Sequence, residues 1–219
     1  MKESTMQVVG VAGRKRSGKD TVALMLEEEY GFKRLALANP LKECLSTFLG
    51  VPEPLDKESV VSFSVSQEDL MEMAHLLRLD SGVFIERFRE QMKEWCGQNC
   101  YTLPYRKLIQ TVGTDICRAL DEQVWIRRTM YEITMCKKYG GRNKFVVSDI
   151  RFDNEAEFIH NLLGSVWCVT SKRGEYDNHS SEKGIDEKYV SCIITNNGTL
   201  EELRESVKRA YKQFSGGRE

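Results

Sequence analysis

The segment Gly13-Arg14-Lys15-Arg16-Ser17-Gly18-Lys19-Asp20-Thr21 directly follows the apolar run Val8-Val9-Gly10-Val11-Ala12. A strand that leads into a glycine-bounded loop and then a helix is the context of a phosphate-binding loop. Gly13 and Gly18 allow the backbone to curl until its N–H groups point at one centre, and the helix adds its positive dipole end there. The sequence therefore predicts nucleotide binding, with Lys19 reaching the outer phosphates.

The residue after this lysine departs from the usual pattern of such loops. Asp20 stands where a Ser or Thr normally contacts Mg²⁺, and Thr21 follows one place later. Four cations lie within residues 14–19, which is more than a structural turn needs. This local concentration of positive charge suits a small anionic ligand.

Composition limits the classes of partner. The 219 residues carry a formal net charge of −1, so we expect no nucleic-acid polymer and no membrane surface as a partner. The seven cysteines are scattered without a CxxC pair, as expected for reduced packing residues. The sequence has no signal peptide and no apolar run that could span a bilayer. We therefore expect an intracellular, cytoplasmic protein.

Strand and helix patterns alternate along the chain. Strands are expected at residues 32–38, 144–150, 164–170 and 189–195, and helices at 19–30, 41–49, 106–120, 123–137, 154–163 and 200–214. This alternation predicts an α/β protein with a central parallel sheet flanked by helices. Because ligands of such sheets gather at the carboxyl ends of the strands, we expect Gly13–Lys19, Asn39, Asp149 and Ser171 onward at one edge.

Two segments interrupt this alternation. Residues 50–66 contain Pro52, Pro54 and several serines and are expected to be a connector, and two amphipathic helices follow them. We predict a helical insertion over about residues 50–105 and a polar lid over about residues 171–184. Both belong to a single domain that spans residues 1–219.

Asp149 and Arg151 stand at the end of a buried strand pattern. A carboxylate there can orient Mg²⁺ directly or through water, whereas the alternative is an aspartate that caps the next turn. The donor fork of Arg151 fits the phosphate of an acceptor, and the alternative is an ordinary surface arginine.

The predicted lid carries Arg173 and His179. An arginine that approaches the transferring group stabilises its spread negative charge, and Arg173 is our candidate. Composition alone also describes a solvated polar loop. His179 is not required as a proton carrier, because the acceptor in phosphate-to-phosphate transfer is already an anion.

Between these motifs, several residues have open interpretations. Lys42 lies one turn into a helix, where a second substrate can be held. Gln110, Thr114 and Arg118 form a polar stripe that is either a binding face or a solvent face. Trp125 either stacks on a base or belongs to the core.

Four segments together resemble the deoxynucleoside monophosphate kinases of tailed bacteriophages and their bacterial relatives. They are the phosphate loop, Arg106-Lys107-Leu108-Ile109-Gln110-Thr111-Val112-Gly113-Thr114-Asp115, Ser148-Asp149-Ile150-Arg151-Phe152-Asp153-Asn154-Glu155 and His179-Ser180-Ser181-Glu182-Lys183-Gly184. The likeness runs from residue 8 to about residue 205. Phe152-Asp153-Asn154 departs from the Phe-Pro-Asn usual in the family, and residues 50–100 match poorly.

The resemblance implies a P-loop kinase that transfers the γ-phosphate of ATP, with Mg²⁺, to a deoxynucleoside monophosphate. It suggests a homodimer in the cytoplasm of a bacterium or of a phage-infected host. The catalytic candidates are Lys19, Arg151 and Arg173, and Arg173 lies in the segment that matches the lid of the family. The implied ATP-binding residues are Gly13, Arg16, Ser17, Gly18, Lys19, Asp20 and Thr21, with Asp20 and Asp149 near the metal. The implied monophosphate-binding residues are Lys42, Arg106, Gly113, Thr114, Trp125, Asp149, Arg151 and Glu155.

Two other functions remain open at the level of sequence. A phosphomevalonate-kinase-like transferase shares the Lys-Ser-Gly-Lys-Asp type of loop, but its acceptor has no base for Trp125 to contact. A non-catalytic module that senses nucleotides would bind ATP without turnover. Assays with monophosphate acceptors distinguish the three.

Overall fold

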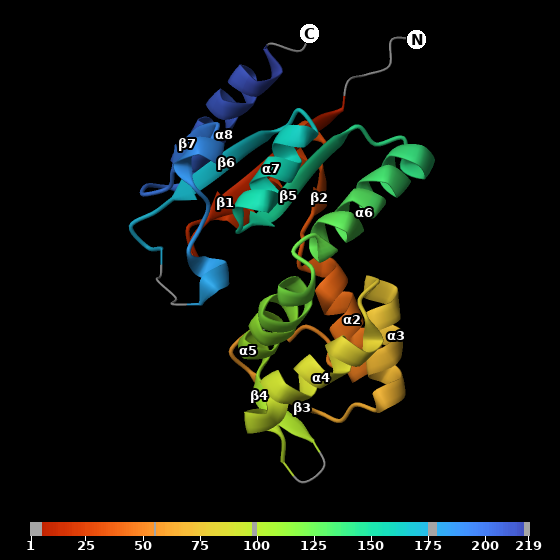
Figure 1. Cartoon of the computed structure of the whole chain (residues 1–219). Coiled ribbons are helices and arrows are strands. Elements are labelled where there is room, and N and C mark those ends of the chain that lie inside the picture. Colours follow the sequence, from red (N-terminus) through yellow and green to blue (C-terminus); the bar gives the residue numbers. More distant parts are fainter. Residues whose placement is uncertain (1–5, 55, 98–99, 175–178, 217–219) are drawn as a thin grey trace. The chain divides into compact units, whose positions relative to one another are not determined.

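The structure is a computed structural model that describes residues 6–54, 56–97, 100–174 and 179–216. It divides into two compact units (Figure 1): the first combines Met1–Leu37 with Thr129–Glu219, and the second is Ala38–Arg128. Along the sequence, the second unit is one continuous segment that separates the two parts of the first unit. The insertion predicted over about residues 50–105 lies within it, with residues 55, 98 and 99 outside the described residues.

The first unit contains a five-stranded sheet. Its strands are β1 (Gln7–Gly13), β2 (Lys33–Leu35), β5 (Lys144–Ile150), β6 (Ser165–Thr170) and β7 (Cys192–Thr195). They pair in the order β2-β5-β1-β6-β7, and every neighbouring pair is parallel. The central strands β1 and β5 are buried on both faces, as strands of a covered parallel sheet require. The predicted central parallel sheet is confirmed.

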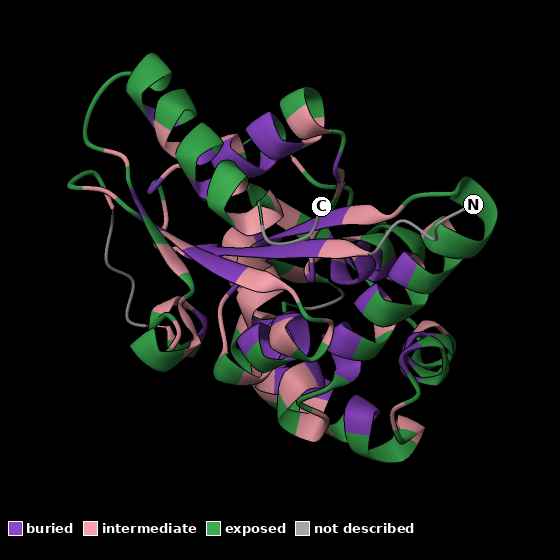
Figure 2. Cartoon of the chain, turned by 90° about the horizontal axis from the view of Figure 1, so that it is seen from above, coloured by how far each residue is buried: buried purple, intermediate pink, exposed green. Residues whose placement is uncertain are grey.

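Two helices cover one face of this sheet. Val9 and Val11 of the central strand β1 pack in one apolar cluster with α1 (Lys19–Tyr30) and α8 (Leu200–Ser215). Figure 2 shows the strands largely in the colour of buried residues, while the outer sides of the helices are exposed. The buried sides of α1 and α8 therefore form an apolar core with this face of the sheet.

The opposite face of β1 lies against α7 (Asp153–Asn161). Gly10 sits on this face, and a Cβ there would lie only 2.9 Å from Cγ1 of Ile159. The absence of a side chain at Gly10 therefore allows α7 to approach the sheet closely.

The strands end together at one edge of the sheet. Ala12 of β1 lies opposite Ile150 of β5, and Gly13 lies opposite Val169 of β6. The last residues of β6 and β7 also lie opposite each other. The segments after β1, β5, β6 and β7 consequently leave the sheet at the same edge. This confirms the prediction for Gly13–Lys19, Asp149 and Ser171 onward, whereas Asn39 belongs to the second unit.

Helices dominate the second unit. Its elements are α2 (Asn39–Leu49), β3 (Val60–Phe63), α3 (Gln67–Leu77), α4 (Ser81–Met92), the 3₁₀ turn η1 (Lys93–Trp95), β4 (Tyr101–Pro104), α5 (Tyr105–Gln110) and the π-helix η2 (Thr111–Arg118). α6 (Val124–Gly140) begins here and continues into the first unit. The side chains of Ser66 and Asp80 cap the N-termini of α3 and α4, so backbone N–H groups at these helix starts have local hydrogen-bond partners.

Three sequence predictions about elements were wrong. The expected connector contains β3, which pairs antiparallel with β4. The expected strand at 189–195 begins only at Cys192, because Glu187–Tyr189 forms the 3₁₀ turn η4. The single helix expected at 106–120 is α5 followed by η2, with wider π turns that the apolar spacing alone does not reveal.

The cysteines lie both in the core and at the surface: Cys44 and Cys117 are buried, whereas Cys96 and Cys100 are exposed, so the predicted packing role does not hold for the exposed pair. All seven cysteines are free thiols, and burial raises the pKa of the Cys44 thiol to about 11. No helix within the described residues is both long enough and apolar enough to cross a membrane.

Candidate active site

The phosphate-binding loop begins where β1 ends. Gly13 and Gly18 have φ angles of 151° and 98°, a region that side chains disfavour. A Cβ on Gly13 would lie 2.6 Å from both Ser17 Oγ and the Val169 carbonyl oxygen, so only glycine fits. The backbone of Arg16 has a left-handed conformation with φ 61°. Such a conformation is strained for a residue with a side chain, and it is common in functional loops. The loop is thus a tight turn whose shape depends on its glycines.

The phosphate-binding loop is followed directly by helix α1, whose N-terminus has no side-chain cap within the described residues. In the same unit, by contrast, the side chain of Thr199 caps α8. The first backbone N–H groups of α1 can therefore donate hydrogen bonds to a ligand, and the positive end of the helix dipole favours an anion there. Lys19 adds its charge at this point; its side chain is only 12% exposed and lies 3.7 Å from the Asp20 carboxylate.

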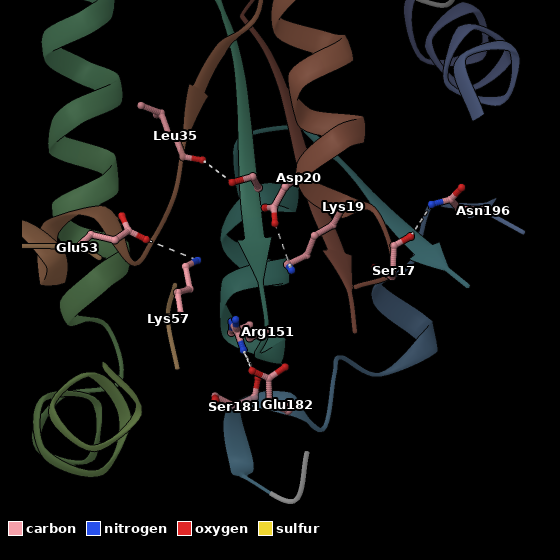
Figure 3. Close-up of polar contacts among 11 residues, drawn as sticks. Ser17, Lys19, Asp20, Leu35, Glu53, Lys57, Arg151, Ser181, Glu182 and Asn196 are labelled. Atoms are coloured by element: carbon pink, nitrogen blue, oxygen red, sulfur yellow. Dashed lines mark hydrogen bonds and ion pairs between the residues drawn. The ribbon is translucent and has the colours of Figure 1, made fainter. Parts of the chain in front are cut away.

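Ser17 and Asn196 form a contact that the sequence did not reveal. The Asn196 amide donates a hydrogen bond of 2.9 Å to the Ser17 carbonyl, bridging the loop after β7 and the phosphate loop (Figure 3). The buried Ser17 hydroxyl has no partner within the described residues. A buried hydroxyl without a partner is costly, which fits a ligand that completes the loop.

At the end of β5, the side chain of Asp149 forms a hydrogen bond with the backbone of a neighbouring segment. Its carboxylate accepts a hydrogen bond of 2.7 Å from the N–H of Leu37, just beyond β2. The neighbouring Ser148 hydroxyl donates to the Leu35 carbonyl. Asp149 therefore stands at the predicted sheet edge and also holds the chain that leaves β2.

Arg151 follows Asp149 and forms an ion pair with Glu182. Its Nη1 group donates to the Glu182 carboxylate and, at 3.2 Å, to the Ser181 carbonyl (Figure 3). Burial by itself would lower the pKa of Arg151, but the carboxylate of Glu182, with Asp149 and Glu155 nearby, raises it. Arg151 is therefore a charged guanidinium with a defined orientation.

Glu155 is buried and organises the turn between β5 and α7. One carboxylate oxygen accepts hydrogen bonds from the N–H groups of Arg151 at 2.8 Å and Phe152 at 3.1 Å. In the structure the side chain of Glu155 stabilises backbone. Its contact with a monophosphate stays a prediction.

The segment of the predicted lid is described on both sides of residues 175–178, which lie outside the described residues. Arg173 is exposed, and its N–H donates to the Ser171 hydroxyl at 3.2 Å. The His179 ring accepts from the Ser181 N–H and caps the 3₁₀ turn η3 (Ser180–Glu182). His179 thus has a structural part in this turn, and the role of Arg173 stays a prediction.

The second unit holds the other predicted monophosphate residues. Lys42 forms an ion pair of 3.0 Å with Glu53, while Arg106 and Thr114 are half-buried in α5 and η2. Trp125 is buried at 6% exposure, and its indole N–H donates to the Gly113 carbonyl at 3.0 Å. Trp125 and Gly113 therefore stabilise the π-helical segment. Base contact by Trp125 stays a prediction.

The fold and the loop together define a class. A parallel sheet whose first strand runs through a glycine-bounded loop into an uncapped helix, with a half-buried lysine at its start, is a P-loop nucleotide-binding protein. A second cationic side chain, Arg151, stands at the same edge of the sheet. This combination is typical of P-loop enzymes that transfer phosphoryl groups.

The comparisons with known proteins identify the family. The model of the family described as deoxynucleotide monophosphate kinase matches residues 7–70 and 57–207. The deoxynucleotide monophosphate kinase of Enterobacteria phage T4 is 26% identical, with 94% of this chain and 99% of the relative covered. The deoxynucleoside-5'-monophosphate kinase of Escherichia phage T5 is 30% identical, with 86% and 89% covered. The chain belongs to the deoxynucleotide monophosphate kinase family, and the predicted resemblance is confirmed.

Among solved structures, the dephospho-CoA kinase from Campylobacter jejuni matches 98% of this chain and 100% of its own length. Its TM-score is 0.48, with 14% sequence identity.

Proposed function

We propose that this chain transfers the γ-phosphoryl group of ATP to a deoxynucleoside monophosphate and releases a deoxynucleoside diphosphate and ADP. The observation that carries the proposal is the shared sheet edge. The phosphate loop with Lys19 follows β1, and the oriented guanidinium of Arg151 follows the adjacent strand β5. Two cationic sites on neighbouring strands suit a reaction in which one phosphate is passed to another. Membership of the kinase family supports the same reaction.

The donor nucleotide occupies the phosphate loop in this proposal. Backbone N–H groups between Gly13 and Thr21 bind the phosphates, and Lys19 bridges the outer ones. The half-buried side chain of Lys19 loses little further hydration when it binds, so its charge acts at short range. The Ser17 hydroxyl lies within this loop; it is buried and has no hydrogen-bond partner in the part of the chain that the structure describes.

The carboxylates of this site fit a Mg²⁺ ion that binds together with the nucleotide. Among the described residues, no three His, Cys, Asp or Glu side chains form a metal-binding group. Mg²⁺ commonly binds one or two carboxylates together with substrate phosphates and water, so a complete protein cage is not needed. Asp20, whose side chain is 72% exposed, and Asp149 are the carboxylates that would hold it. When bound, Mg²⁺ neutralises charge on the phosphates.

The acceptor phosphate is bound by Arg151 in this proposal, with Lys42 and Arg106 as further cationic contacts. Gly113, Thr114, Trp125 and Glu155 shape the surroundings of the monophosphate, and Arg173 approaches the transferring group. The protein needs no general base, because the attacking oxygen belongs to a phosphate that is already ionised. Positioning and charge neutralisation supply the rate enhancement.

The test is a coupled ADP-release assay with the full chain, ATP and Mg²⁺. We expect turnover with at least one of dGMP, dTMP, dAMP, dCMP and a 5-substituted dCMP, and loss of turnover with excess EDTA that added Mg²⁺ restores. Turnover with phosphomevalonate alone would contradict the proposal. ATP binding without turnover for any monophosphate would instead identify a nucleotide-sensing module.

Asn196 provides a separate prediction about the donor site. Asn196→Ala removes a hydrogen bond to the Ser17 carbonyl, and we expect about fivefold weaker binding of a non-hydrolysable ATP analogue. Asn196→Asp should weaken binding further, because a carboxylate cannot donate to that carbonyl and adds a negative charge near the triphosphate.

Isothermal titration calorimetry measures both affinities. Asn161→Ala, an exposed asparagine at the end of α7, is the matched control and should bind like the wild type. Equal affinity in all four proteins would show that the contact to Ser17 does not organise the loop.

A further inference from the structure

The ion pair between Arg151 and Glu182 is unequally exposed. The side chain of Glu182 is 6% exposed, whereas that of Arg151 is 33% exposed. Buried ion pairs contribute little net stability, because removing both charges from water costs about as much as their attraction returns. The arrangement therefore needs a reason other than stability, and the exposed part of Arg151 suggests one.

The hydrogen bonds of the guanidinium are confined to one nitrogen. Nη1 donates both to Glu182 and to the Ser181 carbonyl. Within the described residues, Nε and Nη2 have no protein acceptor. These two nitrogens form the side-on fork of an arginine, which matches two oxygens of one phosphate. The protein thus occupies one side of a planar group and leaves the phosphate-binding side available.

Glu182 is itself held in place by its own turn. Its N–H donates to the His179 carbonyl at 2.9 Å, and the His179 ring lies 2.9 Å from the hydroxyl of the buried Ser181. The backbone of Arg151 is fixed separately by Glu155. Both ends of the arginine side chain are therefore anchored, one by β5 and its turn and the other by η3.

We propose that Glu182 is a positioning residue for phosphoryl transfer. It fixes the guanidinium of Arg151 so that the Nε–Nη2 fork faces the phosphate of the acceptor nucleotide. Glu182 acts through Arg151 and does not touch substrate. This inference rests on the proposed function, because it assigns the phosphate of that reaction to the fork.

The test compares steady-state kinetics of the full chain with Glu182→Ala and Glu182→Gln. Glu182→Ala should raise KM for the deoxynucleoside monophosphate about tenfold and lower kcat, because a mispositioned contact group reduces productive alignment. KM for ATP should stay within about twofold of the wild type. Glu182→Gln retains an acceptor for Nη1 and should recover most of the loss. Glu187→Ala, an exposed glutamate in η4, is the matched control.

A double variant distinguishes positioning from a general effect on folding. If Glu182 acts through Arg151, Arg151→Ala combined with Glu182→Ala should be no slower than Arg151→Ala alone. The double variant also removes both charges, so it provides the test even where Glu182→Ala fails to fold.

Four outcomes would overturn the inference. Unchanged monophosphate KM in Glu182→Ala, with normal wild-type turnover, overturns the inference alone. A lower KM would show that Glu182 competes with the phosphate for Arg151, and additive losses in the double variant would show independent roles. If the wild type turns over no deoxynucleoside monophosphate, the proposed function fails and this inference fails with it.

Discussion

Replacing Lys19 with alanine is expected to lower kcat by about a thousandfold or more while the chain remains folded. Lys19 is the cation at the start of α1, where no side chain caps the helix. Its side chain is largely shielded from water, so its interaction with phosphate oxygens is weakly screened. The negative charge that spreads over the transferring group would lose its nearest fixed counter-charge.

Kinetics and circular dichroism together measure this effect. The expected result is a large loss of kcat with an unchanged unfolding midpoint, because the ion pair that Lys19 forms within the described residues is a 3.7 Å contact with the exposed Asp20. Lys208→Ala removes the same side chain from an exposed position of α8 and should retain activity. Wild-type turnover in Lys19→Ala would exclude the phosphate-loop assignment.

Arg151→Ala should have the second largest effect, and it should change both activity and stability. Loss of a charged two-pronged contact is expected to lower kcat/KM for the monophosphate on the order of a hundredfold. The same substitution leaves the buried carboxylate of Glu182 without its arginine. We therefore expect the free energy of unfolding to fall by about 2 kcal/mol, since breaking one side of a buried ion pair is costly.

Arg151→Lys separates the two contributions. Lysine retains the charge but cannot serve Glu182 and a phosphate with a planar fork, so stability should recover more than kcat/KM. Urea unfolding and initial rates measure the two quantities. If neither the monophosphate KM nor kcat changes in Arg151→Ala, the residue belongs to the surface, and the acceptor phosphate is bound elsewhere.

Local patterns made part of this fold predictable. The phosphate loop is encoded within nine consecutive residues, because its glycines, its lysine and the helix start are adjacent. The strand at 144–150 was predicted with its observed bounds, since a short apolar run between polar segments is typical of a buried parallel strand. The bounds of α1 and α8 were also predicted closely, at residues 19–30 and 200–214, from the helical pattern of the sequence.

Pairing between distant segments explains what was missed. Val60 of β3 lies opposite Pro104 of β4, and neither four-residue strand has a strong alternation of its own. Each becomes a strand only when the other supplies hydrogen bonds. The π-helix η2 likewise depends on packing, because α and π turns place apolar residues at similar spacing.

The residues of the candidate site likewise fall into those that the sequence indicates and those that only the structure reveals. Lys19, Asp149 and Arg151 could be named from the sequence, because each stands at a recognisable strand end or loop. Glu182 was quoted as part of a segment that carries the family resemblance but was given no role, and Asn196 was not singled out. Their partners, Arg151 and Ser17, are 31 and 179 residues away in the chain. No local spacing encodes such contacts.

The sequence by itself determined the class of this protein, since the strand, the glycine-bounded loop and the uncapped helix are adjacent in the chain and form a phosphate site through backbone geometry alone. Only the tertiary structure decided which side chains hold that site in shape. The order of the parallel strands brings the ends of β1, β5, β6 and β7 to one edge. The hydrogen bonds made there join residues that are far apart along the chain, and such bonds depend on three-dimensional distance, which sequence separation does not specify.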